Sequence, residues 1–164
     1  MKYGMWIWNL KSTEAGDPVA QARVAKEAGI TDVMIKIANG TAIFNYDEKT
    51  GRDYCLDTIK SFRAVGVTVW GWQYFYGWNP SGEAKVAIDQ VRRYGLDKFI
   101  VDAEKDIKGY GAKPAEDYLH AIKGGMPGVT IGFTTYRWPT LHPDFPWKPL
   151  LDHCAIAMPQ VYWE

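Results

Sequence analysis

The sequence has few cysteines and no excess of either charge. Its 164 residues contain two cysteines, Cys55 and Cys154, which are far apart and belong to no metal-binding or redox motif. We expect two ordinary buried thiols, with a disulfide as the alternative. The 19 basic and 19 acidic residues balance to zero net charge. The protein therefore lacks the electrostatic signature of nucleic-acid binding and of attachment to an anionic membrane.

Long apolar runs and recognisable cofactor motifs are also absent. No apolar stretch is long enough to span a bilayer, and residues 1–4 lead into a predicted strand, unlike a signal peptide. His120, His142 and His153 do not have the spacing of metal ligands. No glycine-rich phosphate loop follows the first strand. We expect neither a metal nor a cofactor.

Aromatic residues, in contrast, are abundant. They make up 15% of the chain, with eight tryptophans and ten tyrosines. A core can hold some of them, but Trp and Tyr in clefts also stack on sugar rings or nucleic-acid bases. Because the chain has no basic excess, a sugar is the better expectation.

Strands and helices are predicted to alternate along the chain. Apolar runs predict strands at 5–9, 32–38, 67–76, 99–104, 129–135 and 154–161, and apolar periodicity with capping residues predicts helices at 18–28, 56–65, 80–94, 114–122 and 147–151. Residues 105–113 read as a polar loop and 136–146 as a proline-rich loop. This alternation indicates a parallel sheet with right-handed crossovers.

We expect an α/β fold with one domain over residues 1–164, a TIM-like (β/α) barrel. Polar and aromatic residues follow every predicted strand, which favours a barrel over an open sheet with one switch point. A complete barrel has eight strands and about 250 residues, so only the first six strand–helix units are represented. We therefore expect a C-terminally truncated barrel, with an open six-stranded sheet as the alternative.

The fourth predicted strand ends in two acids. Asp102 and Glu104 share a face with Ile100, because side chains alternate along a strand. When two carboxyl groups are neighbours, the pKa of one is raised. That group can then donate a proton while the other stays ionised. We expect Glu104 to be a general acid and Asp102 an ionised stabiliser of positive charge. The alternative is structural, with Asp102 capping a loop and Glu104 in a salt bridge.

Other polar and aromatic residues near strand ends are candidates for sugar binding. If Lys36 is buried, it needs an oppositely charged partner, and Asp102 or Glu104 could be that partner. The lysine would then belong either to the site or to a structural ion pair. Aromatic side chains could stack on sugars, and amides could hydrogen-bond them. The full set of candidate substrate-binding residues is Trp8, Lys36, Gln73, Tyr74, Trp78, Tyr136, Gln160 and Tyr162.

The order of motifs resembles glycoside hydrolase family 25, the phage and bacterial lysozymes. The similar segments are 33–41, 71–75, the DxE at 102–104, 132–135 with Trp138, and 158–162. This resemblance implies a barrel glycosidase that cuts peptidoglycan without a cofactor, uses Asp102 and Glu104, and works outside the cell or with a phage. A polysaccharide would be its partner.

Two features keep other interpretations open. Trp6 stands where the family usually has an acid in its first strand, which favours a non-catalytic glycan-binding or structural barrel as the alternative. Residues 97–104 also resemble the fourth strand of family 18 chitinases, although Ile100 replaces an expected Asp. Both resemblances imply a polymer of N-acetylated amino sugars.

Overall fold

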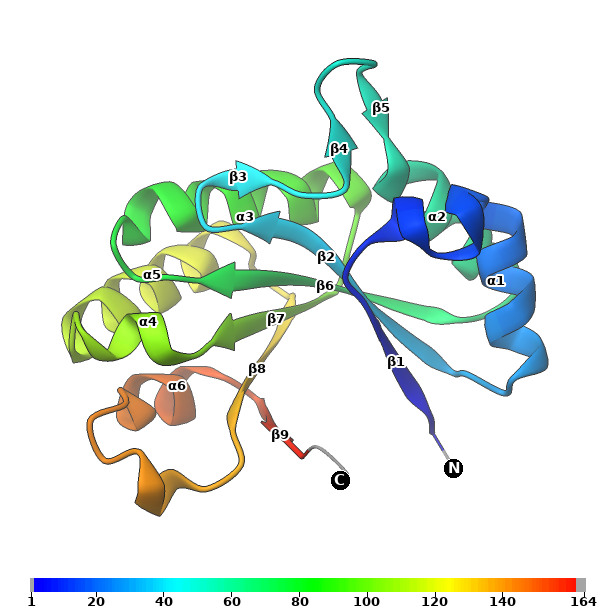
Figure 1. Cartoon of the computed structure of the whole chain (residues 1–164). Coiled ribbons are helices and arrows are strands. Elements are labelled where there is room, and N and C mark those ends of the chain that lie inside the picture. Colours follow the sequence, from blue (N-terminus) through cyan, green and yellow to red (C-terminus); the bar gives the residue numbers. More distant parts are fainter. Residues whose placement is uncertain (1, 162–164) are drawn as a thin grey trace.

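The protein is built around a curled sheet of parallel strands. The computed structural model describes residues 2–161. Within them, six parallel strands follow the order β1-β2-β6-β7-β8-β9, as Figure 1 shows. Their bounds are β1 Gly4–Ile7, β2 Asp32–Asn39, β6 Thr68–Phe75, β7 Lys98–Ala103, β8 Thr130–Tyr136 and β9 Ile156–Gln160. The prediction of six strand–helix units of a (β/α) barrel is confirmed, and the described strands form part of a barrel.

Helices connect the strands along one side of the sheet (Figure 1). They are α1 Pro18–Glu27, α2 Tyr54–Ala64, α3 Pro80–Tyr94, α4 Lys105–Lys108, α5 Ala112–Gly125 and α6 Trp147–His153, with short 3-10 turns η1 Leu10–Ser12, η2 Glu14–Gly16 and η3 Pro139–Leu141. Asp17 caps α1 by accepting hydrogen bonds from the Val19 and Ala20 amides, and Gly95 ends α3 in the left-handed conformation. These are the capping residues that the sequence pattern indicates.

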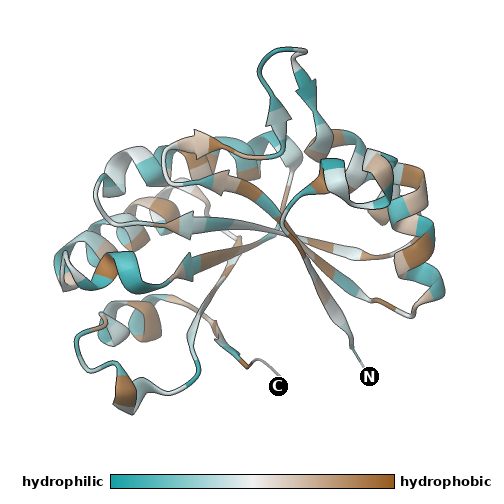
Figure 2. Ribbon diagram, viewed as in Figure 1, coloured by the Kyte–Doolittle hydropathy of each residue, from teal (hydrophilic) through white to brown (hydrophobic). Residues whose placement is uncertain are grey.

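The sheet has two different faces. The outer face packs on the helices through side chains such as Ile35, Phe99 and Phe133, which are almost fully buried. The inner face carries a smaller apolar cluster that includes Met34, Trp72 and Ile100. Figure 2 shows hydrophobic residues along the central strands and a hydrophilic β4–β5 hairpin. The large core therefore lies between the sheet and the helices, and the side chains of the inner face are not part of it.

Two predicted loops contain short elements. After β2 the chain forms β3 Ala42–Ile43, which pairs antiparallel with β2, and a hairpin of β4 Tyr46–Asp47 and β5 Arg52–Asp53. The polar loop expected at 105–113 is wrong in part, because α4 and the first residues of α5 lie there. Ile107, the only apolar side chain in α4, is fully buried and anchors this turn.

The cysteines are free thiols, with Cys55 buried and Cys154 half-buried. Burial raises the pKa of each thiol to about 12, so both are protonated at neutral pH and unreactive. No helix within residues 2–161 has the length and hydropathy needed to cross a bilayer.

Replacing Gly77 by alanine is expected to destabilise the fold by about 2–4 kcal/mol. Gly77 follows β6 with φ +87, and an added Cβ would lie 2.1 Å from Cδ1 of the buried Ile107. Urea unfolding followed by circular dichroism measures the change. Gly124→Ala is the control, because outside its chain neighbours and its own helix backbone no atom lies within 4 Å of an added Cβ. A Gly77→Ala variant as stable as this control would show that the loop tolerates a side chain.

Candidate active site

Strand register brings polar side chains from several strands to one end of the inner face. Asp102 pairs with Tyr74 of β6 on one side and with Thr134 of β8 on the other. Lys36 pairs with Trp72, and Gln160 with Tyr136. Because side chains alternate, the residues two positions along each strand share this face. The carboxyl ends of the strands therefore surround one site, as in other parallel α/β proteins.

Asp102 and Glu104 both line one cavity of about 440 Å³. The amide nitrogen Nε2 of Gln160 donates hydrogen bonds to Glu104 Oε1 at 2.8 Å and to Asp102 Oδ1 at 3.3 Å. One amide group from β9 thus bridges both carboxyl groups. The other lining residues are mainly aromatic or apolar: Trp6, Trp72, Thr134, Met158, Pro159 and Val161.

The electrostatics of Asp102 differ from the expectation that it stays ionised. Its side chain is only 8% exposed, and burial, together with the negative charge of Glu104, raises its pKa to about 7, while Lys36 acts in the opposite direction. Below pH 7 the more buried acid therefore carries a proton. The sequence showed two neighbouring acids but not which of them loses more solvent.

Lys36 is buried beside this pair in a cage of aromatic rings. Its Nζ lies 4.6 Å from the ring centroid of Phe44, 4.7 Å from that of Trp72 and 5.8 Å from that of Tyr74. Burial lowers the pKa of Lys36, and attraction to Asp102 and Glu104 opposes this shift. Ring faces attract a cation most strongly when water is excluded. The lysine therefore supplies positive charge to the site from within the protein.

A third acid, Asp106 of α4, belongs to the same region. The Tyr74 hydroxyl donates a hydrogen bond of 2.6 Å to Asp106 Oδ2. Burial and the neighbouring carboxylates raise the pKa of Tyr74, so it remains a neutral donor. Asp106 is not among the residues expected from the sequence, because it falls in the segment predicted to be a loop. A prediction of a helical turn directly after Glu104 would have placed Asp106 near the acid pair.

Gln73 is not part of the cavity, and its assignment to substrate binding is corrected. It points to the outer face, where it is fully buried. Its Nε2 donates to the carbonyl oxygens of Gly40 and Glu83, and its Oε1 accepts from the Tyr118 hydroxyl. Since Tyr74 faces the inner site, its neighbour in the strand faces the helices. Gln73 joins β6 to the helix layer.

The remaining described aromatic candidates, Trp8, Trp78 and Tyr136, do not line this cavity. Trp8 and Trp78 are 62% and 54% exposed, at the ends of β1 and β6. Tyr136 stacks on His142 with ring centroids 3.7 Å apart and lies under Lys108. Tyr162 lies outside the described residues. Trp6, which the sequence analysis did not include among the candidates, lines the cavity and packs edge-on against Trp72 at 5.6 Å.

Solved structures with related folds are found, although no family model and no curated protein matches the chain. A family 18 chitinase from Cycas revoluta, in complex with allosamidin, is 14% identical with a TM-score of 0.69, covering 98% of this chain and 55% of that one. A family 29 α-L-fucosidase from Bacteroides thetaiotaomicron is 14% identical with a TM-score of 0.59, covering 80% and 45%. A hydroxymethylglutaryl-CoA lyase from Pseudomonas aeruginosa is 18% identical with a TM-score of 0.61, covering 96% and 52%.

These similarities establish a fold that glycosidases share. The chain spans about half the length of these three proteins. The lyase performs a different kind of reaction on the same fold, so the likeness by itself does not decide the chemistry. Any decision about function has to come from the residues of the cavity.

Proposed function

We propose that the protein is a glycoside hydrolase that acts on a polymer of N-acetylated amino sugars through Asp102 and Glu104. The observation that carries the proposal is the bridging of both carboxyl groups by the Gln160 amide inside one aromatic-walled cavity. Two carboxyl groups beside a sugar-sized cavity are the usual requirement for glycoside hydrolysis. The resemblance to phage and bacterial lysozymes supports the further proposal that the protein works outside the cell or with a phage.

In the free protein Asp102 holds the proton of the carboxyl pair below pH 7. In this mechanism the proton passes to Glu104, the less buried of the two, when the sugar enters, and Glu104 delivers it to the glycosidic oxygen as general acid. Asp102 is then ionised and stabilises positive charge at the sugar carbon, or orients the N-acetyl group so that its carbonyl oxygen bonds to that carbon as the glycosidic bond breaks. A water molecule that gives its proton back to Glu104 then bonds to the same carbon, displaces that oxygen and completes hydrolysis. Lys36 limits the accumulated negative charge, and the exposed Trp6 offers a face for stacking of the sugar ring.

The spacing of the two acids gives further support. Glu104 Oε1 and Asp102 Oδ1 both lie within 3.3 Å of Gln160 Nε2, so these two oxygens are at most about 6 Å apart. Carboxyl groups joined by one amide leave little space for the water molecule that inverting glycosidases hold between theirs. We therefore propose that hydrolysis retains the anomeric configuration. NMR of the first product formed from a chitin oligomer reads the anomer directly.

The polymer is peptidoglycan in the lysozyme-like version of this proposal and chitin in the chitinase-like version. Peptidoglycan is favoured by the order of motifs along the chain, and chitin by the structural similarity to a family 18 chitinase. Release of reducing ends from purified peptidoglycan and from N-acetylglucosamine oligomers separates the two. Turnover of either polymer supports the proposal, and turnover of neither, with the folded protein, contradicts it.

A second candidate function is glycan binding without hydrolysis. The observation in its favour is Trp6, a 42% exposed side chain that lines the cavity on the first strand, where the resembling lysozymes carry an acid. In this case the protein would retain insoluble chitin or peptidoglycan in a pull-down. Binding to the insoluble polymer would be unaffected by Glu104→Gln, and no product would be released.

A further inference from the structure

A second cavity, of about 490 Å³, has a lining that shares no residue with the candidate active site. It is formed where β1 and β2 end, by the loop after β1, by β3 and by the β4–β5 hairpin that projects in Figure 1. Its lining includes Lys11, Phe44, Asn45 and Tyr46. None of these residues takes part in the proposed hydrolysis.

Two exposed aromatic side chains belong to this region: Tyr46 lines the cavity, and Trp8 packs against Phe44 of the lining. Trp8 is 62% exposed and stacks on Phe44, with ring centroids 6.3 Å apart and an interplanar angle of 23°. Tyr46 is 40% exposed on the hairpin. Large apolar side chains gathered at the surface usually mark a binding site. Aromatic faces of this kind suit the apolar faces of sugar rings.

The backbone beneath these rings is held in a fixed and unfavourable conformation. Asn45 has φ +57, in the left-handed region. Its Nδ2 donates to the carbonyl oxygens of Trp8 at 3.1 Å and Lys36 at 2.9 Å, and its Oδ1 accepts from the Leu10 amide at 2.9 Å. Asn enters this region more readily than most residues, and these three hydrogen bonds hold it there. Asn45 thus fixes the carbonyl of Trp8 to the end of β2.

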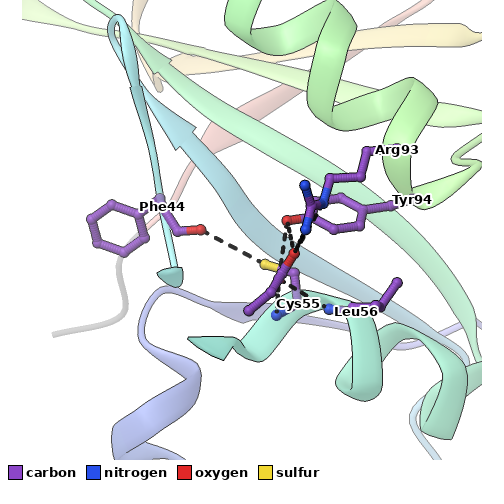
Figure 3. Close-up of polar contacts among 6 residues, drawn as sticks. Phe44, Cys55, Leu56, Arg93 and Tyr94 are labelled. Carbon is purple, nitrogen blue, oxygen red and sulfur yellow. Dashed lines mark hydrogen bonds and ion pairs between the residues drawn. The ribbon is translucent and has the colours of Figure 1, made fainter. Parts of the chain in front are cut away.

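Phe44 is held from the other side by α2. Its amide donates to the Ile37 carbonyl at 3.0 Å, and its carbonyl oxygen accepts from Cys55 Sγ at 3.8 Å, as Figure 3 shows. The start of α2 is itself secured, because Asp53 caps the helix and pairs with Arg93 at 2.9 Å. Rings fixed in advance lose little entropy when a ligand binds.

The buried Lys36 lies between the linings of the two cavities. Its Nζ lies 4.6 Å from the ring centroid of Phe44, which lines the second cavity, and 4.7 Å from that of Trp72, which lines the first. The two rings that flank this lysine therefore belong one to each cavity. The rim of the second cavity carries both signs of charge, Lys11, Lys49, Asp47 and Glu48. Such a rim suits an uncharged hydroxylated chain better than a polyanion.

We propose that Trp8, Phe44 and Tyr46 form an extended subsite that binds further rings of the glycan held at Asp102 and Glu104. The inference rests on the proposed function, since it takes the same N-acetylated glycan as ligand. It adds a prediction that the catalytic pair alone does not make. Affinity should depend on chain length, and the part gained by longer chains should depend on Trp8.

The test measures binding of N-acetylglucosamine oligomers by calorimetry in a Glu104→Gln background, where the ligand is not consumed. Adding Trp8→Ala is expected to raise the Kd of the hexamer about three- to tenfold through loss of stacking, with the Kd of the dimer unchanged. Tyr46→Ala is expected to act in the same direction. Tyr3→Ala is the matched control, because Tyr3 is 53% exposed at the opposite end of β1.

An unchanged hexamer Kd in both Trp8→Ala and Tyr46→Ala would overturn the subsite. If Trp8→Ala lowers the melting temperature, Tyr46→Ala decides, because its side chain lies on the exposed hairpin. The two proposals fail separately. Hexamer binding that depends on Trp8, without turnover by the unaltered protein, contradicts only hydrolysis. Turnover that depends on Glu104, with length-independent binding, contradicts only the subsite.

Discussion

Replacement of Glu104 by glutamine is expected to lower kcat on an N-acetylated amino-sugar polymer by roughly 10²–10⁴-fold, the usual contribution of a general acid. Glutamine keeps the shape of the side chain, and its Oε1 can still accept the hydrogen bond that Gln160 Nε2 donates at 2.8 Å. It has no proton to give to the leaving oxygen. Release of reducing ends at saturating substrate measures the loss.

Glu116→Gln is a matched control for this prediction, since Glu116 is exposed on α5. We expect its kcat to equal that of the unaltered protein. A Glu104→Gln variant with kcat within a factor of two of the control would remove Glu104 from the mechanism. A large fall in kcat with an unchanged melting temperature would support its role as the acid.

Replacement of Asp102 by asparagine is expected to stabilise the fold at alkaline pH while abolishing turnover. In the native protein the pKa of Asp102 is raised from 3.8 to about 7 by burial and by Glu104. The unfolded chain therefore loses this proton near pH 4, whereas the folded protein keeps it until about pH 7. As the pH rises from about 4 to about 7, Asp102 therefore lowers the free energy of unfolding progressively, by up to about 4 kcal/mol in total.

Asparagine does not ionise, so this loss disappears in the variant. The difference in unfolding free energy between Asp102→Asn and the unaltered protein should be near its minimum at pH 4 and rise until about pH 7. Urea unfolding at a series of pH values measures it. Asp89 forms an exposed ion pair with Lys85 on the same helix. The variant Asp89→Asn should therefore show almost no such rise. A pH-independent difference for Asp102→Asn would mean that Asp102 titrates like an exposed acid.

Much of the scaffold is predictable because its signals are local. Alternation fixed which side chains of the fourth strand share a face, and Asp17, Gly95 and their counterparts marked the helix ends. The short elements were missed for a physical reason. Four residues of α4 and two-residue strands are too short for a periodic pattern, and α4 depends on burial of Ile107.

The site was less predictable, because its properties depend on contacts across strands. The sequence placed Asp102 and Glu104 together, but the raised pKa of Asp102 depends on how deeply it lies. Gln73 was assigned to the site from the motif around it, yet its neighbour Tyr74 takes the inner face. The cage around Lys36 includes Phe44, which comes from the irregular segment after β3. No periodic pattern anticipates that ring.

The most direct measurement is an NMR titration of the Asp102 carboxyl carbon, with and without the N-acetylglucosamine tetramer. Our account predicts a midpoint near pH 7 in the free protein, and a shift of that midpoint when the sugar enters the cavity and displaces water. It also predicts a lower midpoint in Glu104→Gln, where the neighbouring charge is gone. A midpoint near 4 that neither the sugar nor Glu104→Gln changes would contradict a coupled acid pair at a glycan site.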